Sequence, residues 1–340
     1  MILAKFSEVN TMGQIYTIDE VNKMIDEGKK LVLSGDEKVL ERLNTGFWIA
    51  GTTPYFFGQN GGELNQEMIF VEQLPEYVAD VSIKTYDENT IKNIYTEAPD
   101  HGFVLVIMTG FSKTLDFFSM NAPEFPDFAT RPLFGWVSGS ILEDIGKVPA
   151  KIYDGRKKKS MEEGAISFHV SLPPNKIASL DFVNIFEQGD GDELTFPEDG
   201  YSFKEIFVNG EKKNFAEYLM ENKVDFKCPL VADYYGAKIN TSLKELHEEE
   251  KIVDLWCPVF KGVSYKLSAP VPDYAAAFIE NVPNGLGDQV VFSCNCLLNY
   301  LYGELEGKRT ADIRGPITFG EIAYQLLNQT LAYLTITDRE

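Results

Sequence analysis

The most informative stretch of the sequence lies near its end and consists of three motifs: Phe292-Ser293-Cys294-Asn295, Gly315-Pro316-Ile317-Thr318-Phe319-Gly320-Glu321-Ile322 and Leu327-Asn328-Gln329-Thr330-Leu331. The β-branched and aromatic run 290–292 predicts a buried strand that brings Cys294 and Asn295 to the end of a sheet. Apolar residues mixed with Thr and Ala predict a half-buried strand over 330–336. Gly315 and Gly320 predict a turn close to the Cys294 strand, because glycine adopts positive φ and leaves room for a neighbouring backbone or ligand.

Length and composition indicate a folded, acidic protein. The 340 residues exceed the usual size of one hydrophobic core, so two domains or two packed halves are expected. Hydrophobic residues make up 44% of the chain, which is enough for a packed interior. The net charge of −21 disfavours binding to nucleic acid or to an anionic membrane surface.

The sequence also favours a cytoplasmic location. No signal peptide is recognisable, and the longest apolar run, 103–108, is too short to span a bilayer. Four cysteines are too few for a disulfide framework, which fits a reducing compartment. Cys294 and Cys296 have the form of half a metal site, but no second Cys/His pair at ligand spacing accompanies them. Free thiols, no metal and no cofactor are therefore expected.

Patterns outside the three motifs predict local elements. Thr17-Ile18-Asp19-Glu20 and Ser34-Gly35-Asp36-Glu37 have the form of capping boxes and predict helix starts. The continuous apolar run 102–108 predicts a fully buried strand. Asn209-Gly210 predicts a turn, and Gly61-Gly62-Glu63 predicts a loop.

Two further segments carry a clear prediction. Residues 152–155 and 164–170 predict two strands paired around the basic turn 156–159. The charged segment 243–250 predicts a helix with a solvated face.

Three predicted strand ends share one composition, in which glycines stand beside hydroxyl-bearing residues: Gly51-Thr52-Thr53, 135–139 and 315–320. No period of about 20 to 50 residues accompanies them, which excludes a solenoid and favours two related or stacked halves. The predicted fold is α+β. It has mixed sheets covered by helices, in two packed halves, with ligand-facing turns where strands end.

No nucleotide-binding or catalytic motif is complete. The segment Gly135-Trp136-Val137-Ser138-Gly139 places its serine one position late for a nucleophile elbow, and neither a dinucleotide fingerprint nor a phosphate loop occurs. His169 is expected to be a strand residue and His247 a surface residue. A cysteine-dependent hydrolase using Cys294 is an alternative, but its thiol needs a lowered pKa and no basic neighbour is visible in the sequence.

The Ser-Cys-Asn strand end, the Gly-x-x-x-x-Gly-Glu-Ile segment and the closing Asn-Gln-Thr strand together resemble the C-terminal part of the FIST family, a sensory module of bacterial signalling proteins. Looser similarities in the same order extend over residues 45–336, as in a divergent, stand-alone member. The second half of FIST proteins similarly opens with an Asn-Gly turn. The resemblance therefore implies a FIST N-like half at 1–200, with an αβα extension at 1–45, and a FIST C-like half at 201–340.

The resemblance implies an intracellular sensor of bacterial signal transduction. Its expected ligand is a small polar metabolite, with amino acids and related compounds as the class. No output domain follows the last predicted strand, so the signal is expected to pass through a separate partner protein or a homo-oligomer. A structural or partner-binding protein without a pocket is a third alternative, beside the sensor and the hydrolase.

Small and polar residues at the predicted turns form the expected ligand site. Glu321 has two interpretations. With Thr318 it completes the Thr-x-x-Glu capping box of a short helix, or its carboxylate lines a pocket and contacts an ammonium group. For the set as a whole the family resemblance favours a pocket, lined by Thr52, Thr53, Ser138, Cys294, Asn295, Gly315, Thr318, Gly320, Glu321 and Asn328.

Overall fold

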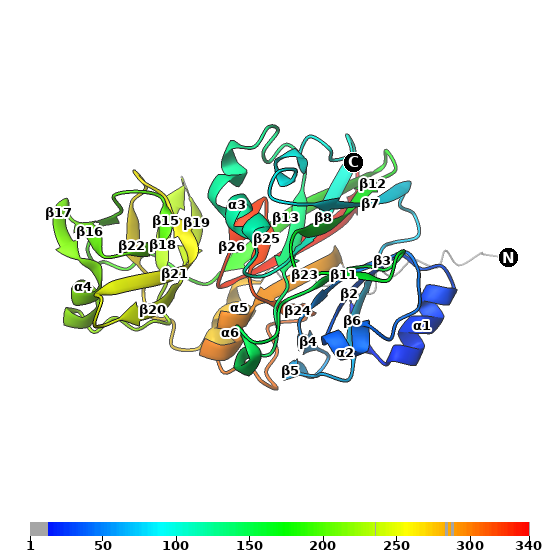
Figure 1. The fold of residues 1–340 in the computed structure, drawn as a ribbon, viewed down its shortest axis with the longest axis horizontal. Helices are drawn as coiled ribbons and strands as arrows, with labels where there is room; N and C mark the ends of the chain where they lie inside the picture. Colours follow the sequence, from blue (N-terminus) through cyan, green and yellow to red (C-terminus); the bar gives the residue numbers. More distant parts are fainter. Residues whose placement is uncertain (1–12, 235, 283–284, 287–288, 340) are drawn as a thin grey trace.

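Strands dominate the structure. The computed structural model describes residues 13–234, 236–282, 285–286 and 289–339. Strands hold 42% of the residues and helices 16%, which is consistent with an α+β fold built on mixed sheets. The molecule has a body of three six-stranded sheets and an outer module, residues 194–267, which lies at one end of the long axis (Figure 1).

The first sheet has the strand order β1-β6-β2-β3-β10-β11, and helices α1 and α2 pack on it. The capping box at Thr17 is confirmed, whereas α2 is capped by Asp36 rather than Ser34. The elements are β1 (Gln14–Tyr16), α1 (Ile18–Asp26), β2 (Leu31–Gly35), α2 (Glu37–Leu40), β3 (Trp48–Thr52), β6 (Ile69–Gln73), β10 (Ile152–Asp154) and β11 (Lys159–Met161).

The second and third sheets complete the body. The second has the order β26-β25-β9-β8-β12-β7, and the third has the order β13-β27-β23-β24-β4-β5. Their elements are β4 (Tyr55–Gly58), β5 (Gly61–Leu64), β7 (Asp80–Tyr86), β8 (Gly102–Met108), α3 (Lys113–Asn121), β9 (Leu133–Val137), β12 (Ala165–Ser171), β13 (Lys176–Asn184), α5 (Tyr274–Asn281), β23 (Val290–Cys296), α6 (Leu297–Tyr302), β24 (Gly315–Thr318), β25 (Glu321–Ala323), β26 (Gln325–Leu327) and β27 (Thr330–Asp338). Short 3-10 helices lie in loops: η1 (Ile91–Asn93), η2 (Ala122–Glu124) and η3 (Leu142–Asp144).

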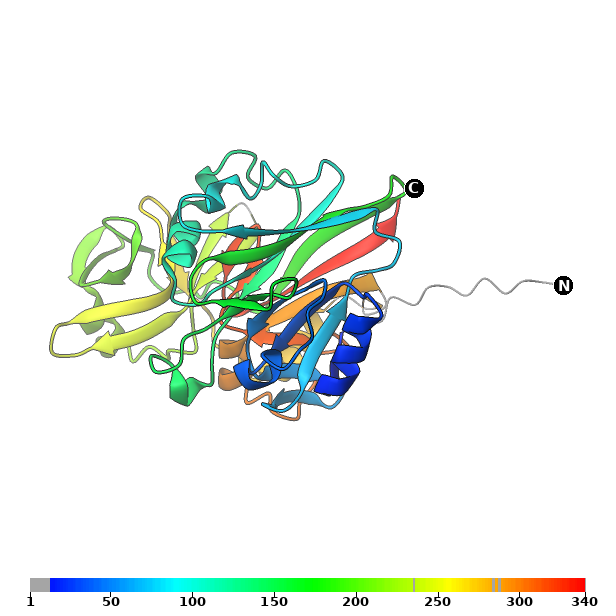
Figure 2. The ribbon, with the colours of Figure 1, turned by 45° about the vertical axis from the view of Figure 1, so that its right-hand side comes forward.

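The main hydrophobic core lies between the sheets. Ile49 of the first sheet, Phe134 and Trp136 of the second, and Phe292 and Leu334 of the third belong to one buried cluster. Figure 2, turned from the view of Figure 1, shows the three sheets stacked around this interior. The inner faces of the three sheets are thus covered by one another, whereas helical residues such as Phe118 of α3 and Phe278 of α5 belong to the clusters on other faces of the second and third sheets.

The outer module has its own core, which includes Phe196, Phe215 and Tyr265. A six-stranded sheet with the order β17-β16-β14-β22-β18-β19 packs with the three-stranded sheet β15-β21-β20. Its elements are β14 (Leu194–Thr195), β15 (Gly200–Phe203), β16 (Glu205–Val208), β17 (Glu211–Asn214), α4 (Phe215–Glu221), β18 (Leu230–Tyr234), β19 (Ala237–Thr241), β20 (Leu243–His247), β21 (Ile252–Val259) and β22 (Tyr265–Leu267). Residue 200, the expected boundary between halves, is the first residue of β15, and β13 before it pairs with β27 after it.

Each body sheet contains one pair of parallel strands joined through a helix: β2-α2-β3, β8-α3-β9 and β23-α6-β24. Parallel strands need such a crossover, because the chain must return to the same edge of the sheet before the second strand begins. The three strand ends singled out in the sequence follow the second strand of each unit. The shared composition therefore reflects a shared local topology.

Several local predictions are confirmed. Strands occupy 290–296 and 330–338. Segment 315–320 lies beside the end of the Cys294 strand, as predicted, since Thr318 pairs with Cys296. Asn209-Gly210 forms the turn between β16 and β17. Both turn residues have positive φ (50° and 83°), which suits a two-residue hairpin.

Other local predictions are wrong. Segment 243–250 begins with strand β20 rather than a helix, since it pairs with β21 and buries Leu243. Strand β10 pairs with β3 and β11 instead of β12, which lies in the second sheet. Residues 61–64 form β5, and 315–318 form β24 instead of a turn. In these cases backbone pairing with another strand overrides the local signal, whether the partner is close in the chain, as for β5 and β20, or distant, as for β10 with β3.

Gly135 in β9 is a test of how tightly the second sheet is packed. A Cβ at this position would lie 1.9 Å from the carbonyl oxygen of Val106 in the neighbouring strand β8. We expect Gly135→Ala to lower the free energy of unfolding by about 2–3 kcal/mol or more, since the strands must move apart. Urea unfolding measures the change. Gly191→Ala is the matched control, because nothing lies within 4 Å of its Cβ, and equal stability of the two variants would contradict the argument.

Candidate functional site

The three strand ends that follow the crossover units meet at one junction in the body. The backbone N–H of Gly139, after β9, donates to the carbonyl of Thr52 in β3 at 2.7 Å. The hydroxyl of Thr53 donates to the carbonyl of Ile317 in β24 at 2.6 Å. These two hydrogen bonds link the first sheet directly to the second sheet and to the third. In open α/β sheets, the carboxyl ends of parallel strands are a usual position for ligand sites.

Glycine makes the third contact of the junction possible. The N–H of Phe319 donates to the carbonyl of Val137 at 3.1 Å, and a Cβ at Gly139 would lie 2.0 Å from the Phe319 ring. Ser138 lies between these contacts, fully buried, and its hydroxyl has no hydrogen-bond partner among the described residues.

The Glu321 side chain is enclosed by neighbouring residues of the body. Its carboxyl oxygen Oε2 accepts hydrogen bonds from the hydroxyl and N–H of Thr330 at 2.9 and 3.3 Å, and Oε1 accepts one from Thr318 at 3.4 Å. It lies in strand β25, so the capping-box interpretation is wrong. Burial raises the pKa of Glu321 to about 8, although the hydrogen bonds from Thr330 oppose the shift. The side chain is therefore mostly a neutral acid at pH 7, with little charge to attract a cation.

The other predicted site residues share this burial. Asn295 accepts a hydrogen bond from Asn299 of α6 at 2.9 Å, while the Asn295 amide nitrogen has no partner among the described residues. The Cys294 thiol contacts the carbonyl of Gly135 at 3.5 Å, and burial together with nearby Glu321 and Glu72 raises its pKa well above the ordinary value. Such a thiol stays protonated, which removes the activation that a nucleophile needs. Gly315, the first residue of β24, and Gly320, directly before β25, are both buried.

Asn328 connects the body to the outer module. Ser242 donates a hydrogen bond from its hydroxyl either to Asn328 at 3.1 Å or to Gln329, since it carries only one hydrogen. Asn240 donates to the backbone carbonyls of both residues at 3.3 Å. The motif around Asn328 is therefore an attachment point between body and module.

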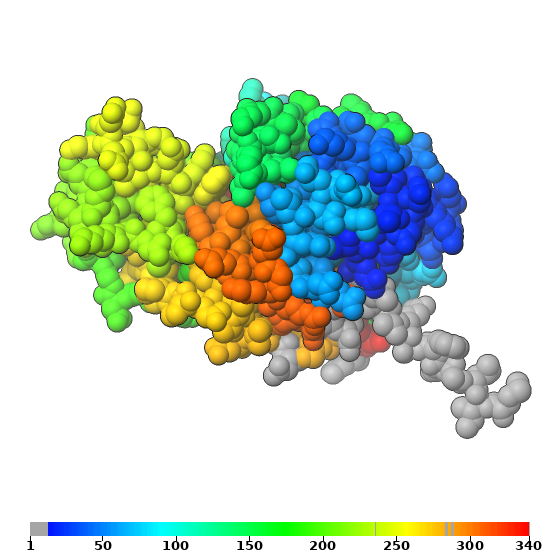
Figure 3. Space-filling model, turned by 90° about the horizontal axis from the view of Figure 1, so that it is seen from below, coloured from blue at the N-terminus to red at the C-terminus, as the bar shows by residue number. Residues whose placement is uncertain are grey.

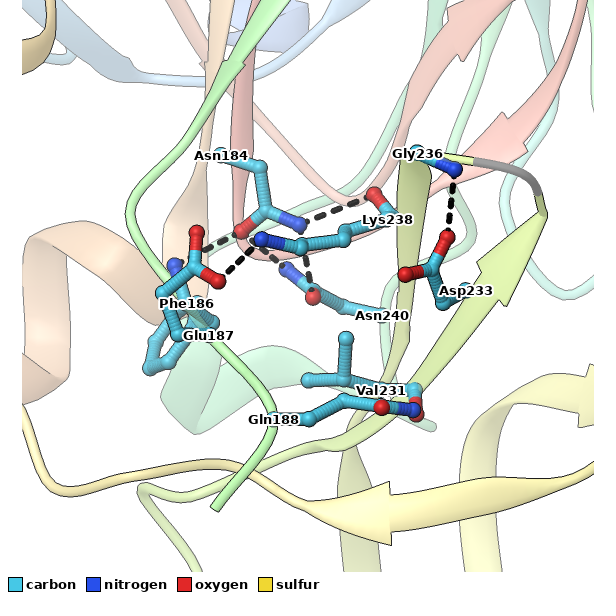
Figure 4. Close-up of polar contacts among 9 residues, drawn as sticks. All are labelled: Asn184, Phe186, Glu187, Gln188, Val231, Asp233, Gly236, Lys238 and Asn240. Atoms are coloured by element: carbon cyan, nitrogen blue, oxygen red, sulfur yellow. Dashed lines mark hydrogen bonds and ion pairs between the residues drawn. The ribbon is translucent and has the colours of Figure 1, made fainter.

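Figure 4 shows further contacts of this attachment, between the segment after β13 and the module. The side chains of Asn184 and Asn240 exchange amide hydrogen bonds of 2.9 and 3.0 Å, and Asn184 also donates to the Lys238 carbonyl. Gln188 donates to the Val231 carbonyl at 2.8 Å, and Lys238 pairs with Glu187. The chain that leaves β13 for the module is thus bound to the β18–β19 hairpin, which orients the module against the body.

A cavity of about 430 Å³ lies between the body and this oriented module. This volume falls within the usual range for small-molecule sites, about 300–1,000 Å³. The body supplies residues after β8, on α3 and around the junction, and the module supplies residues of β15, β20 and β21. We call this cavity the cleft. It is lined by Gly110, Phe111, Leu115, Asp116, Val137, Tyr201, Ser202, Lys244, Asp254, Leu255, Trp256, Phe319 and Leu326.

Aromatic side chains from both sides face each other across the cleft. The rings of Phe111 and Trp256 have centroids 6.4 Å apart, and the Lys244 ammonium lies 5.0 Å from the Trp256 ring centroid. Phe111 is 57% exposed and has φ of +57°, a conformation that bulky side chains rarely adopt. Tyr201 of the module, which lines the cleft, is hydrogen-bonded to Ser119 of α3 and so links the module to the body there.

The charged residues of the cleft have both signs. Partial desolvation raises the pKa of Asp116, with a further contribution from Glu163, while Lys244 opposes the shift. Burial also acts to raise the pKa of Asp254, but hydrogen bonds from Ser202 and His247 and the charges of His247 and Lys244 lower it overall. Lys244 is thus close enough to influence both carboxyl groups.

Sequence reasoning missed the cleft, because its lining comes from segments that are far apart in the chain. The segment 315–320 pointed to one wall, since Phe319 lines the cleft beside the predicted Thr318 and Gly320. Thr52 lines a different, smaller cavity of about 150 Å³ near the same junction. Nothing in the sequence marked Phe111 or Trp256, because backbone strain and contacts across sheets appear only in three dimensions.

Residues 16–337 match the family of unknown function DUF6976. The chain belongs to this family. A comparison with curated proteins finds no match. Among the described residues of this DUF6976 member, no helix is long and apolar enough to cross a bilayer.

One group of potential metal ligands lies beside the cleft in this DUF6976 protein. Ligand atoms of Glu245, His247 and Asp254 lie within 4.8 Å of one another. The His247 Nε2 atom is 3.0 Å from the Asp254 carboxyl, a hydrogen bond that raises the pKa of His247. The hydrogen bond already occupies the His247 Nε2 atom and one Asp254 oxygen, so the contact is accounted for without a metal ion.

The buried acids make stability depend on pH. Burial raises the pKa of both Glu72 and Glu321 to about 8, so the folded state keeps protons that the unfolded chain loses above about pH 4.5. We therefore expect the free energy of unfolding to fall as pH rises from 5 to 8. Glu321→Gln removes one of these protons. Between pH 5 and pH 8, the free energy of unfolding of the variant should therefore rise by roughly 1–3 kcal/mol relative to that of the wild type.

Urea unfolding at several pH values between 5 and 8 measures this effect. Glu198→Gln is the control, because Glu198 is exposed and the variant makes the same chemical change outside the core. Parallel pH curves for the wild type and Glu321→Gln would show that Glu321 is ionised in the folded protein.

Proposed function

We propose that the protein is a small-molecule-binding sensory protein, and that its ligand occupies the cleft between body and outer module. The observation that carries the proposal is the combination of aromatic walls with one cation and two carboxyls in a single cavity. Phe111, Trp256 and Phe319 supply apolar surface, and Lys244, Asp116 and Asp254 supply charges of both signs. The resemblance to FIST sensory modules supports the same function.

The charges define the class of ligand. A zwitterion can pair its carboxylate with Lys244 and its ammonium with Asp116 or Asp254. An aromatic or apolar side chain would then contact the Phe111 and Trp256 rings, where a cation is also favourable. These features describe amino acids and related amines. The contact with the ammonium group is therefore assigned to Asp116 or Asp254 in the cleft and no longer to the enclosed Glu321.

The position of the cleft supports a sensory role. A ligand there would contact the body through Phe111 and the module through Trp256, and so would favour the orientation in which both contacts form. Binding energy that depends on orientation can shift the population of module positions. A change at the module surface would then be transmitted to a partner protein or to a second copy of the chain, in the cytoplasm of a bacterium.

The proposal predicts amino-acid binding that depends on Asp116. Titration calorimetry with a panel of amino acids should give saturable binding, strongest for aromatic or large apolar side chains. Asp116→Asn keeps the shape of the side chain but removes its charge, and should weaken binding about tenfold, as expected for a charged hydrogen bond. Trp256 fluorescence provides a second readout, which Trp256→Phe should abolish.

Asp190→Asn is the matched control, because Asp190 is exposed in the loop after β13 and changes the net charge equally. The proposal fails if no amino acid or related amine binds. It also fails if the Asp116 and Asp190 variants lose the same amount of affinity.

A further inference from the structure

The loop between α6 and β24 is held against the β4–β5 hairpin by backbone contacts. The N–H of Gly62 donates to the Lys308 carbonyl at 3.1 Å, and the N–H of Gly307 donates to the Gly62 carbonyl at 2.8 Å. A Cβ at Gly61 would lie 2.6 Å from the backbone of Gly307. These contacts fix the position of the next residues, 309–314. Figure 3 shows this face, with the orange surface near residue 300 beside the light-blue surface of the hairpin.

An unpaired polar group lies in this loop. Thr310 is 1% exposed, and its hydroxyl has no hydrogen-bond partner among the described residues. It lines a cavity of about 10 Å³, which is room for about one water molecule or one ligand oxygen. Buried hydroxyls are nearly always hydrogen-bonded, so this one indicates a missing partner.

Two arginines line the same small cavity. Arg309 is exposed and Arg314 is half-buried, and no carboxylate of the described chain lies within ion-pair distance of either guanidinium. Asp312 is the acidic residue of the lining, so the cavity has an excess of one positive charge. This is a local basic site in a chain whose net charge is −21.

A larger cavity of about 300 Å³ adjoins the small one and shares Gly58, Gln59 and Arg314 with it. Most of its other lining side chains are polar: Gln14, Asn60, Glu63 and Asn65. Amide and carboxylate groups of this kind form hydrogen bonds with hydroxyl groups. The lining therefore suits a hydroxylated molecule better than an apolar one.

We propose that this surface binds a phosphoryl group, either free phosphate or the phosphate of a small hydroxylated ester. One phosphoryl oxygen would occupy the small cavity and accept a hydrogen bond from Thr310. The others would accept hydrogen bonds from Arg309 and Arg314, whose planar guanidinium groups match oxyanions. In an ester, the hydroxylated part occupies the larger cavity. This site lies on β4, β5 and the loop before β24, and it does not depend on the cleft.

Titration calorimetry of the full chain at low salt tests the proposal, with inorganic phosphate, ribose 5-phosphate and ribose as probes. We expect phosphate to bind, ribose 5-phosphate to bind more tightly, and ribose alone not to bind. Equal affinities for phosphate and the ester would support the phosphoryl site and remove the larger cavity from it. The absence of binding by both phosphates at 10 mM would overturn the proposal.

Two variants separate this site from general charge effects. Arg314→Gln should weaken phosphate binding about tenfold or more. Arg42→Gln, an exposed arginine in another part of the body, changes the net charge equally and should have no effect. Equal losses in both variants would overturn the proposal.

Thr310→Val provides a test that does not rely on charge. If the hydroxyl forms its hydrogen bond only with a ligand, the valine variant should unfold at the same or higher urea concentration. It should bind phosphate several-fold more weakly. Unchanged phosphate affinity together with unchanged stability would show that the Thr310 hydroxyl has no role in binding.

Discussion

The close approach of β9 to its neighbours is the constraint on which the body depends. Gly135 lies so near the Val106 carbonyl that no side chain fits, and its own carbonyl accepts the Cys294 thiol of the third sheet. Two residues further on, the same strand reaches the junction through Val137. The spacing of the second and third sheets therefore also fixes one wall of the cleft. The body therefore supplies the cleft with a wall whose geometry is held by sheet packing.

The polar residues near the end of the chain have a structural role in this arrangement. Glu321 ties the beginning of β25 to the beginning of β27 through Thr330, and Asn328 ties the body to the module. Burying so many polar groups is favourable only when nearly all of them are hydrogen-bonded. The cleft lining is of a different kind, with aromatic and aliphatic side chains beside charges of both signs.

The sequence was sufficient for elements whose signals are local. The capping box at Thr17, the Asn209-Gly210 turn and the apolar runs of β8 and β23 follow from neighbouring residues alone. The recognition that three strand ends resemble one another was also justified, since they meet at the junction. The pairing of β10 with β3 could not be predicted, because the two strands are far apart in the sequence. The strand at Leu243 was missed because the run of charged residues after it obscured its pairing with β21. The cleft could not be predicted without the orientation of the module, which depends on contacts such as that between Asn184 and Asn240.

The position of β27 in the third sheet has a consequence for synthesis of the chain. This strand lies between β13 and β23, and it is the last strand of the described chain. During synthesis β13 emerges from the ribosome long before its partner β27, and the module is made between the two strands. Until β27 emerges, β13 and β23 present unpaired edges that can join strands of other chains. Loss of β27 would therefore damage the middle of a sheet, and in the nascent chain the unpaired edges of β13 and β23 are the surfaces that need protection from other chains.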